Sequence, residues 1–267
     1  MKSPLRKRLL RELKSEFGKY LVVFIMMAIT IGFVSGFLVA DGSMLRAYDD
    51  SFQKYNIEDG YFQTKKKLTP AQKEDIEKSD VKVYENFYIE QKLTNGSTIR
   101  FFKNRKEVDK VCLMNGKMPK KSGEIAVDRM YADNNELKVG DTVKSRKKTF
   151  RITGLVALSD YSALFQNNND TMFDAVKFGV AIVTDKDFEA LNQVKVQYNY
   201  AWIYDKKPAT EKKEKKMAED LMEDMADVVT IESFVPQYQN QSIHFTGDDM
   251  GSDRAMIVML LYIVMAI

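Results

Sequence analysis

Cysteine and histidine are almost absent from this chain of 267 residues, which has one of each, Cys112 and His244. A single cysteine excludes an internal disulfide, and this pair is too few for a Cys/His zinc cluster. One histidine argues against a His-centred catalytic triad, and no G-x-S-x-G motif, Walker loop or paired His ligands occur. We therefore predict that the protein is not an enzyme and has no catalytic residue, cofactor or metal ion. A calcium site in residues 167–170 (NNND) is left open as an alternative, but four polar residues do not make a loop of ligands.

A strong net charge is also lacking, because 41 basic and 38 acidic residues leave only +3. That balance creates no basic field for a nucleic acid, so we predict no nucleic-acid partner. The charges are nonetheless unevenly spread. Residues 1–20 hold seven basic and two acidic side chains, whereas residues 42–253 hold 33 and 35. The chain thus starts with a basic end and continues into a nearly neutral region with the composition of a folded domain.

Charge is missing altogether from residues 21–40 (LVVFIMMAITIGFVSGFLVA). Twenty residues of helix rise roughly 30 Å, the thickness of the hydrocarbon core, so we predict a transmembrane helix over 20–41. A signal peptide is the alternative, but its apolar run is shorter and residues 38–41 (LVAD) match a cleavage site poorly. The cations before the helix place residues 1–19 in the cytoplasm and residues 42–253 outside the cell membrane.

Leu5, Leu9, Leu13 and Phe17 recur at helical spacing within the basic end, with cations between them. This pattern predicts an amphipathic helix over 1–19 that lies in the headgroup layer of the lipid bilayer. An unstructured basic segment is the alternative.

Small residues recur every four positions along the predicted transmembrane helix, at Ala28, Gly32, Gly36 and Ala40. Such a stripe allows two membrane helices to approach closely, so we predict that it packs against another helix. Chance is the alternative, since glycine is common in membrane helices.

The end of the chain is a second apolar run, residues 255–267 (AMIVMLLYIVMAI). Thirteen residues of helix reach only about 20 Å, which is too short to cross the hydrocarbon core. We predict that residues 254–267 are the start of a second transmembrane helix cut at a fragment boundary. The alternative is a C-terminal core helix.

Between the two apolar runs, residues 42–253 mix α and β patterns. Thr69 and Pro70 predict a helix start, and Asn95-Gly96 between two alternating stretches predicts a hairpin. Residues 159–175 are irregular and rich in Asn and Asp, which predicts an exposed loop. From 178 to 234 the pattern is β-α-β-α-β, and Met217, Leu221 and Met225 share one helix face. The predicted fold class is α+β: a β-rich hairpin part and a β-α-β-α-β sandwich between the apolar helices.

Three short stretches of this domain form a recurring signature: residues 123–127 (GEIAV), 137–143 (LKVGDTV) and 150–155 (FRITGL). With the helix–domain–helix layout, they resemble the outer domain of the FtsX/MacB-like permeases of ABC transporters. Asp160 and Tyr161 also resemble the residues after this hairpin in Gram-positive members. The motif is structural, and its residues here are Gly123, Glu124, Val139, Gly140, Asp141 and Gly154.

The resemblance implies a permease with four or more membrane helices, a separate ABC ATPase subunit, and a second permease copy or a paralogue. In such systems ATP hydrolysis in the cytoplasm moves the outer domains, which expel or extract a peptide, lipoprotein or lipid. The residues that would contact the ATPase are not among these 267. The alternative function is a membrane-anchored sensor domain of a signalling receptor, which shares the layout but not the signature.

Overall fold

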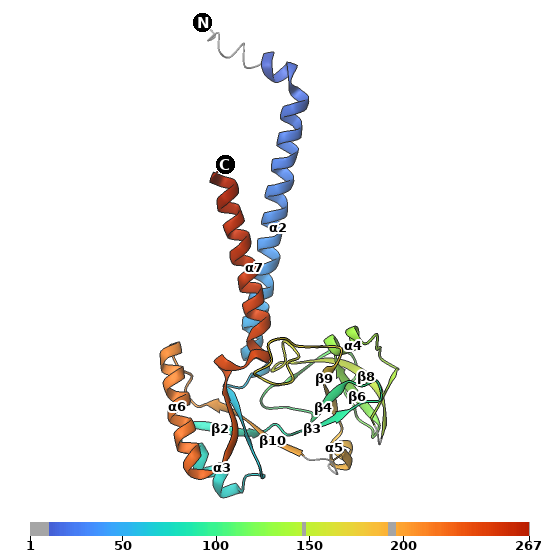
Figure 1. Ribbon diagram of the computed structural model, residues 1–267, viewed down its shortest axis with the longest axis vertical. Helices are drawn as coiled ribbons and strands as arrows, with labels where there is room; N and C mark the ends of the chain where they lie inside the picture. Colours follow the sequence, from blue (N-terminus) through green and yellow to red (C-terminus); the bar gives the residue numbers. More distant parts are fainter. Residues whose placement is uncertain (1–10, 146–147, 192–195, 267) are drawn as a thin grey trace. The chain divides into compact units, whose positions relative to one another are not determined.

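The computed structural model describes residues 11–145, 148–191 and 196–266, drawn as a ribbon in Figure 1. The chain divides into two compact units. One unit holds the helical ends of the chain, up to Tyr48 and from Asp248 onward. The other unit is the folded domain Asp49–Gly247.

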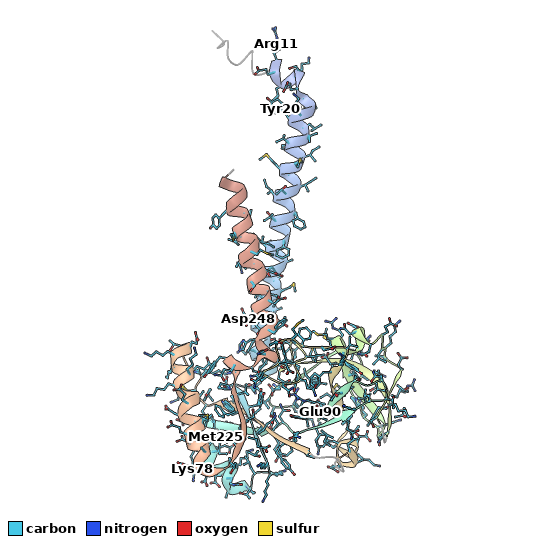
Figure 2. All side chains as sticks on the ribbon, in the orientation of Figure 1. Arg11, Tyr20, Lys78, Glu90, Met225 and Asp248 are labelled. Carbon is cyan, nitrogen blue, oxygen red and sulfur yellow. The ribbon has the colours of Figure 1, made fainter. Side chains whose placement is uncertain are left out.

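Helix α2 (Phe17–Tyr55) has 39 residues and is the one helix in the described part of the chain that could cross a membrane by length and composition. Its apolar side chains are exposed, as at Phe24 (68%) and Phe33 (73%), and Figure 2 shows side chains standing out around the helix from Tyr20 onward. Apolar surface of this extent is unfavourable in water and favourable among lipid tails. The predicted transmembrane helix therefore lies in α2, and the chain is a membrane protein.

Helix α2 continues well beyond the predicted membrane segment. Its 39 residues rise about 58 Å, whereas the hydrocarbon core is about 30 Å thick. The second part carries charged residues such as Arg46, Asp49 and Asp50. The helix ends before Asn56, whose φ of +51° is the left-handed conformation that commonly stops a helix. The predicted domain boundary at residue 42 thus falls inside a helix.

Helix α7 (Gln241–Ala266) contains residues 255–266 of the second apolar run after a polar first half. The second transmembrane helix stays a prediction. Residues 1–10, with Leu5 and Leu9 of the amphipathic pattern, and residue 267 lie outside the described residues. Leu13 and Phe17 of the same pattern are exposed.

Eleven strands in the described residues form one mixed sheet, in the order β11-β1-β10-β3-β4-β9-β6-β8-β5, with β2 paired to β10 and β7 paired to β8. The strands are β1 (Gly60–Thr64), β2 (Val81–Glu85), β3 (Tyr88–Lys92), β4 (Thr98–Lys103), β5 (Val111–Gly116), β6 (Glu124–Asp128), β7 (Thr142–Lys144), β8 (Thr149–Leu158), β9 (Phe178–Val183), β10 (Val196–Tyr204) and β11 (Ile231–Pro236). The domain helices are α3 (Pro70–Glu77), α4 (Arg129–Asn134), α5 (Asp185–Leu191), α6 (Glu211–Val228) and the short 3-10 helix η1 (Gln237–Gln239).

Two hydrophobic cores divide the domain into lobes. The large lobe comprises β3 to β9 with α4 and α5, and every residue of its strand β9 is buried. The small lobe comprises β1, β2, β11, α3, α6 and most of β10. Its core is aromatic, with Phe62 stacked on Tyr200 at 5.2 Å and Trp202 stacked on Phe234 at 4.7 Å between ring centroids.

Strand β10 joins the two lobes. Near its start it pairs with β3 of the large lobe through Val196 and Gln197, and from Tyr200 onward it pairs with β2 of the small lobe. Tyr200, Trp202 and Tyr204 alternate into the small-lobe core. The intervening residues point to the other face of the sheet, because successive side chains of a strand alternate.

Several local predictions are confirmed. Thr69 caps α3 in a capping box with Gln72. Strands β3 and β4 pair as the hairpin around Gly96, whose φ is +89°. Leu221 and Met225 are buried on one face of α6, with Met217 partly buried beside them.

One prediction needs correction. Residues 159–175 contain no helix or strand, but they are not simply exposed, because Leu164 and Phe165 are buried. The elements β9-α5-β10-α6-β11 occur in the predicted order and the α+β fold class is confirmed, although the three strands are not neighbours in the sheet. Strand β9 lies between β4 and β6, whereas β10 and β11 are both neighbours of β1.

Candidate functional site

The signature residues lie around the edge of the large lobe where β6, β7 and β8 meet. The Glu124 carboxylate accepts hydrogen bonds from the backbone N–H groups of Lys120 (2.8 Å) and Lys121 (2.9 Å), which lowers the Glu124 pKa. Gly123 precedes β6 with a φ of +89°. These residues fold the turn that starts the strand.

The second half of the signature builds the β7–β8 turn. Gly140, with a φ of +107°, donates its N–H to the carbonyl of Ile152 at 2.8 Å. The Asp141 carboxylate accepts from the Lys138 N–H at 2.8 Å, and Val139 is 41% exposed. A Cβ on Gly154 would stand 2.6 Å from the carbonyl oxygen of Lys117. The six signature residues therefore lie at turn and packing positions, as expected for a structural motif.

The small residues Ala28, Gly32, Gly36 and Ala40 lie exposed along α2. No described residue comes within 4 Å of a Cβ built on Gly32 or Gly36. Their role in helix packing stays a prediction.

A different group of residues joins the end of α2 to the domain. We call it the joint: residues 56–59, residues 104–110, residues 237–242, Asn86 and Asp160. The backbone N–H of Lys110 donates to the Tyr55 carbonyl at 2.9 Å, and that of Asp109 donates to the Asn56 carbonyl at 3.0 Å. The side chain of Asn56 donates to the Glu107 carbonyl at 2.8 Å. The last turn of α2 is thus bonded to a loop more than fifty residues away in the sequence.

Arg105 is the buried cation of the joint. Its two terminal nitrogens donate to the two carboxylate oxygens of Asp160, each at 2.7 Å, and one also donates to Asn86 at 3.2 Å. Asp109 lies 3.8 Å from the guanidinium. Burial alone would lower the Arg105 pKa, but the carboxylates of Asp160 and Asp109 outweigh it and raise the pKa above its ordinary value. A bidentate pair of this kind is geometrically specific and holds its elements in one register.

Glu58 links this charged centre to the start of α7. Its backbone N–H donates to Asp109 at 2.9 Å, and its side chain accepts from Asn240 at 3.3 Å. The Asn240 side chain also accepts from the N–H of Ser242 at 3.1 Å in the first turn of α7, and Gln237 donates to the Glu58 carbonyl. Both chain segments that lead to the helical ends are therefore bonded within one network.

The joint holds more carboxyl groups than its one guanidinium can neutralise. Burial, followed by the charges of Asp109 and Asp160, raises the Glu58 pKa well above its ordinary value. Burial and the Asp160 charge raise the Asp109 pKa to about 7. Burial therefore favours the protonated form of Glu58, and the pKa of Asp109 lies near neutral pH.

Sequence reasoning missed the joint. Only Asp160 was singled out, through a resemblance, because the members lie in five separate stretches and follow no spacing rule. Of the two scarce residues, Cys112 is half-buried in β5, and His244 lies in α7 with its ring centroid 6.3 Å from that of Phe52. Among the described residues, no three His, Cys, Asp or Glu side chains are grouped to hold a metal ion.

No protein-family model matches the chain, and no curated protein matches it. The solved structures that are similar to it include two with a TM-score of 0.35 each. One is the extracellular domain of the noncanonic ABC-type transporter YknZ from Gram-positive bacteria, at 12% identity over 66% of this chain and 97% of that chain. The other is the periplasmic region of MacB from Actinobacillus actinomycetemcomitans, at 15% identity over 65% and 87%. MacB gives its name to the family that the sequence resembles, but likeness at this level assigns no function.

Proposed function

We propose that this chain is a permease subunit of an FtsX/MacB-like ABC transporter. Its outer domain would move when a separate ABC ATPase hydrolyses ATP in the cytoplasm, and so expel or extract a peptide, lipoprotein or lipid. A second permease copy or a paralogue would complete the membrane part. The basic end before α2 supports a cytoplasmic N-terminus and an extracytoplasmic domain.

The joint is the observation that carries this proposal. A domain driven from the membrane needs a stiff connection to its helices, because a flexible linker would absorb the movement. Here the end of α2, the start of α7 and the large lobe share one hydrogen-bonded network around Arg105 and Asp160. Removing one partner of a buried pair costs about 3–5 kcal/mol, so the folded state strongly favours keeping Arg105 and Asp160 together.

A conservative change at Arg105 tests the coupling. Arg105→Lys keeps the positive charge but loses the bidentate bond to Asp160. With the partner ATPase reconstituted, we expect assembly to persist while transport and domain-dependent stimulation of ATP hydrolysis fall several-fold. Arg129→Lys is the matched control, because Arg129 forms an exposed pair with Asp133 at 3.3 Å.

The same preparation separates a transporter from a sensor. We expect an ATPase to co-purify with the tagged full-length protein from its native membrane. The protein by itself should hydrolyse no ATP. Co-purification of a kinase in place of an ATPase would favour the sensor, and ATP hydrolysis by the permease alone would refute the division of labour. Equal transport by Arg105→Lys and the parent protein would refute the role of the joint.

A further inference from the structure

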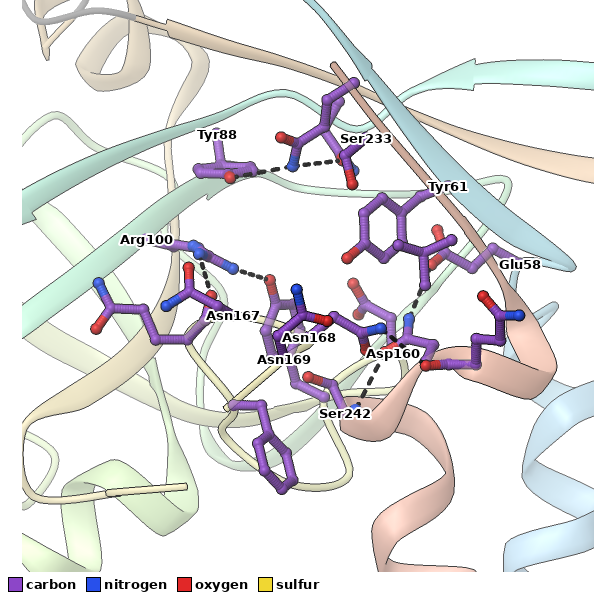
Figure 3. A pocket seen from close by; sticks show the side chains of 18 of the residues that line it. Glu58, Tyr61, Tyr88, Arg100, Asp160, Asn167, Asn168, Asn169, Ser233 and Ser242 are labelled. Carbon is purple, nitrogen blue, oxygen red and sulfur yellow. Dashed lines mark hydrogen bonds between the residues drawn. The ribbon is translucent and has the colours of Figure 1, made fainter. Parts of the chain in front are cut away.

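A polar cavity of about 380 Å³ lies beside the joint, inside the domain (Figure 3). Glu58, Asp160 and Asn240 belong both to its wall and to the joint. Its volume is at the small end of the range for ligand pockets, about 300–1,000 Å³. The cavity thus has room for one compact molecule.

One wall is a row of polar side chains across three neighbouring strands. Gln63 of β1 pairs with Asn199 of β10 on one side and with Ser233 of β11 on the other. Tyr61, two residues before Gln63, lies on the same face. The opposite face of these strands carries the aromatic core of the small lobe. The sheet therefore turns amides and hydroxyls toward the cavity where a packed interior would have apolar groups.

The opposite wall is a loop that is held in place. The Asn168 side chain donates to the Gln239 carbonyl and accepts from the Gln241 N–H, both at 2.9 Å. Ser162 donates to the carbonyls of Ser242 (2.8 Å) and Ile243 (2.7 Å). The cavity is thus bounded by anchored segments.

The charged groups of the cavity wall are already paired. Arg100 donates to Glu90 at 2.9 Å and to the Tyr161 hydroxyl at 3.0 Å, and its guanidinium lies 4.6 Å from the ring centroid of Tyr88. Asp160 is held by Arg105 in the joint. The charges of Arg100 and Asp160 are thus already used in pairs, and burial favours the protonated form of Glu58. A charged ligand entering here would lose its hydration without a free opposite charge.

Several neutral polar groups of the cavity wall, in contrast, have no hydrogen-bond partner in the part of the chain that the structure describes. Within the described residues, no hydrogen bond reaches the hydroxyls of Tyr61 and Ser233, the carbonyl oxygen of the Gln63 side chain or the amide nitrogen of Asn199. Glu58 is 2% exposed, and its second carboxyl oxygen has no hydrogen-bond partner. Buried polar groups are normally satisfied, so the free oxygen of Glu58 calls for a partner. The other groups belong to residues that line the cavity, where they are free to bond the same occupant.

We propose that this cavity binds a neutral polyhydroxylated compound, a mono- or disaccharide in size and chemistry. Hydroxyl groups both donate and accept, which matches a wall of amides, hydroxyls and an acid. The ring of Tyr61, which lines the cavity, supplies flat apolar surface for the C–H face of a sugar ring. A peptide would need apolar pockets for its side chains, and the polar wall offers few.

Calorimetric titration of the full-length protein tests this. The protein is held in nanodiscs or a zwitterionic detergent, because a maltoside detergent would itself present a sugar. The neutral probes are maltose and N,N′-diacetylchitobiose, and the charged probes are glutamate and spermidine. We expect saturable 1:1 binding of at least one neutral probe and none of the charged ones.

Variants locate the binding. Gln63→Leu and Asn199→Leu should weaken it about tenfold, the effect of losing about 1.4 kcal/mol. Asn169 lines the cavity from the exposed part of the loop, so Asn169→Ala should weaken binding without affecting folding. Gln53→Leu is the matched control, because Gln53 is exposed on α2 away from the cavity, and it should bind as the parent does.

Three results would overturn the proposal. The first is the absence of saturable binding by either neutral sugar up to about 10 mM, beyond the weak end of specific affinities. The second is preferential binding of a charged probe. The third is unchanged sugar affinity in Gln63→Leu and Asn169→Ala, both still folded by thermal unfolding. Binding is measured without ATP, so an absence of sugar binding would not contradict the proposed role in transport.

Discussion

At the scale of the residue, the joint concentrates charge that water would otherwise screen. Glu58, Asp109 and Asp160 face one guanidinium, that of Arg105, with Asn86 and Asn240 as the neutral partners. Because burial raises the pKa of two of the three carboxyl groups, the folded protein holds protons that the unfolded chain would release. The protonation state of this centre therefore depends on folding.

The first prediction concerns pH. The Asp109 pKa is about 7 in the fold and 3.8 ordinarily, so between these values the folded state binds more protons than the unfolded state. The free energy of unfolding should therefore fall as pH rises from 5.5 to 7.5, by up to about 1.4 kcal/mol per pH unit per group. Glu58 acts with the same sign. Chemical unfolding followed by the fluorescence of Trp202, the single tryptophan, measures this.

Glu58→Gln is the informative variant, because it puts a neutral amide of similar shape in place of a buried acid whose pKa is raised, and it should flatten the pH dependence. Asp128 adds to the same trend, since burial raises its pKa to about 6, so Asp128→Asn is measured beside it. A free energy of unfolding that increases between pH 5.5 and 7.5 would contradict the assignment.

Gly154 carries a second residue-scale prediction. The carbonyl of Lys117 lies 2.6 Å and a methyl of Leu113 lies 3.2 Å from a Cβ placed on it. Gly154→Ala should therefore lower the free energy of unfolding by about 1–3 kcal/mol, through crowding against backbone that cannot move aside.

Gly251→Ala is the control for Gly154→Ala. Gly251 lies in α7 with no described atom within 4 Å of an added Cβ, and alanine favours a helix over glycine by up to about 1 kcal/mol. The stabilities of the two variants are compared by thermal unfolding of the full-length protein. If Gly154→Ala is as stable as Gly251→Ala, then Gly154 does not lie this close to the Lys117 carbonyl in solution.

At the scale of the element, α2 serves two surroundings. Its first part is apolar and exposed, as a membrane helix requires, whereas residues beyond 41 include Asp49 and Asp50 and lead into the joint. The helix is continuous up to the joint, because no proline or glycine interrupts it after Gly42.

The small-residue stripe gives the element-scale prediction. Moving a leucine side chain from lipid tails into a helix–helix contact gives no hydrophobic free energy, because lipid tails are equally apolar. Close contact between the backbones is what favours helix association in the membrane. Gly36→Leu should disturb assembly with the other membrane helices or abolish transport, while insertion and the domain fold persist. Ile31→Leu, off the stripe and 61% exposed, should be nearly silent. If co-purification and transport are alike for both variants and the parent, the stripe does not form an interface.

At the scale of the whole molecule, orientation in the membrane is the untested property on which the proposed function depends. In a Cys112→Ser background, Ser3→Cys should resist a membrane-impermeant thiol reagent in intact cells, because the cations around it favour the cytoplasm. Asn169→Cys, on the exposed part of the loop, should be labelled readily. The reverse pattern of labelling would invert the topology and remove the basis for an outer domain.

The sequence alone determined the features whose cause is local. Twenty uncharged residues predict the membrane helix, because its length and apolarity follow directly from the bilayer. Thr69, the Asn95-Gly96 pair and the spacing of Leu221 and Met225 predict a cap, a hairpin and a buried helix face, each set by neighbours within a few residues. The α+β fold class follows from these elements.

Only the tertiary structure decided which strands are neighbours and where the polar groups gather. Alternation along β10 marks two faces, but pairing with β1, β2 and β3 depends on contacts far apart in the sequence. Arg105 and Asp160 are 55 residues apart, and Glu58 and Asn240 are 182 apart. From the sequence alone, a charged residue is predicted to be exposed, because burying a charge without a partner is costly. The partners that make burial tolerable here are brought together by the fold, and with them the joint and the cavity.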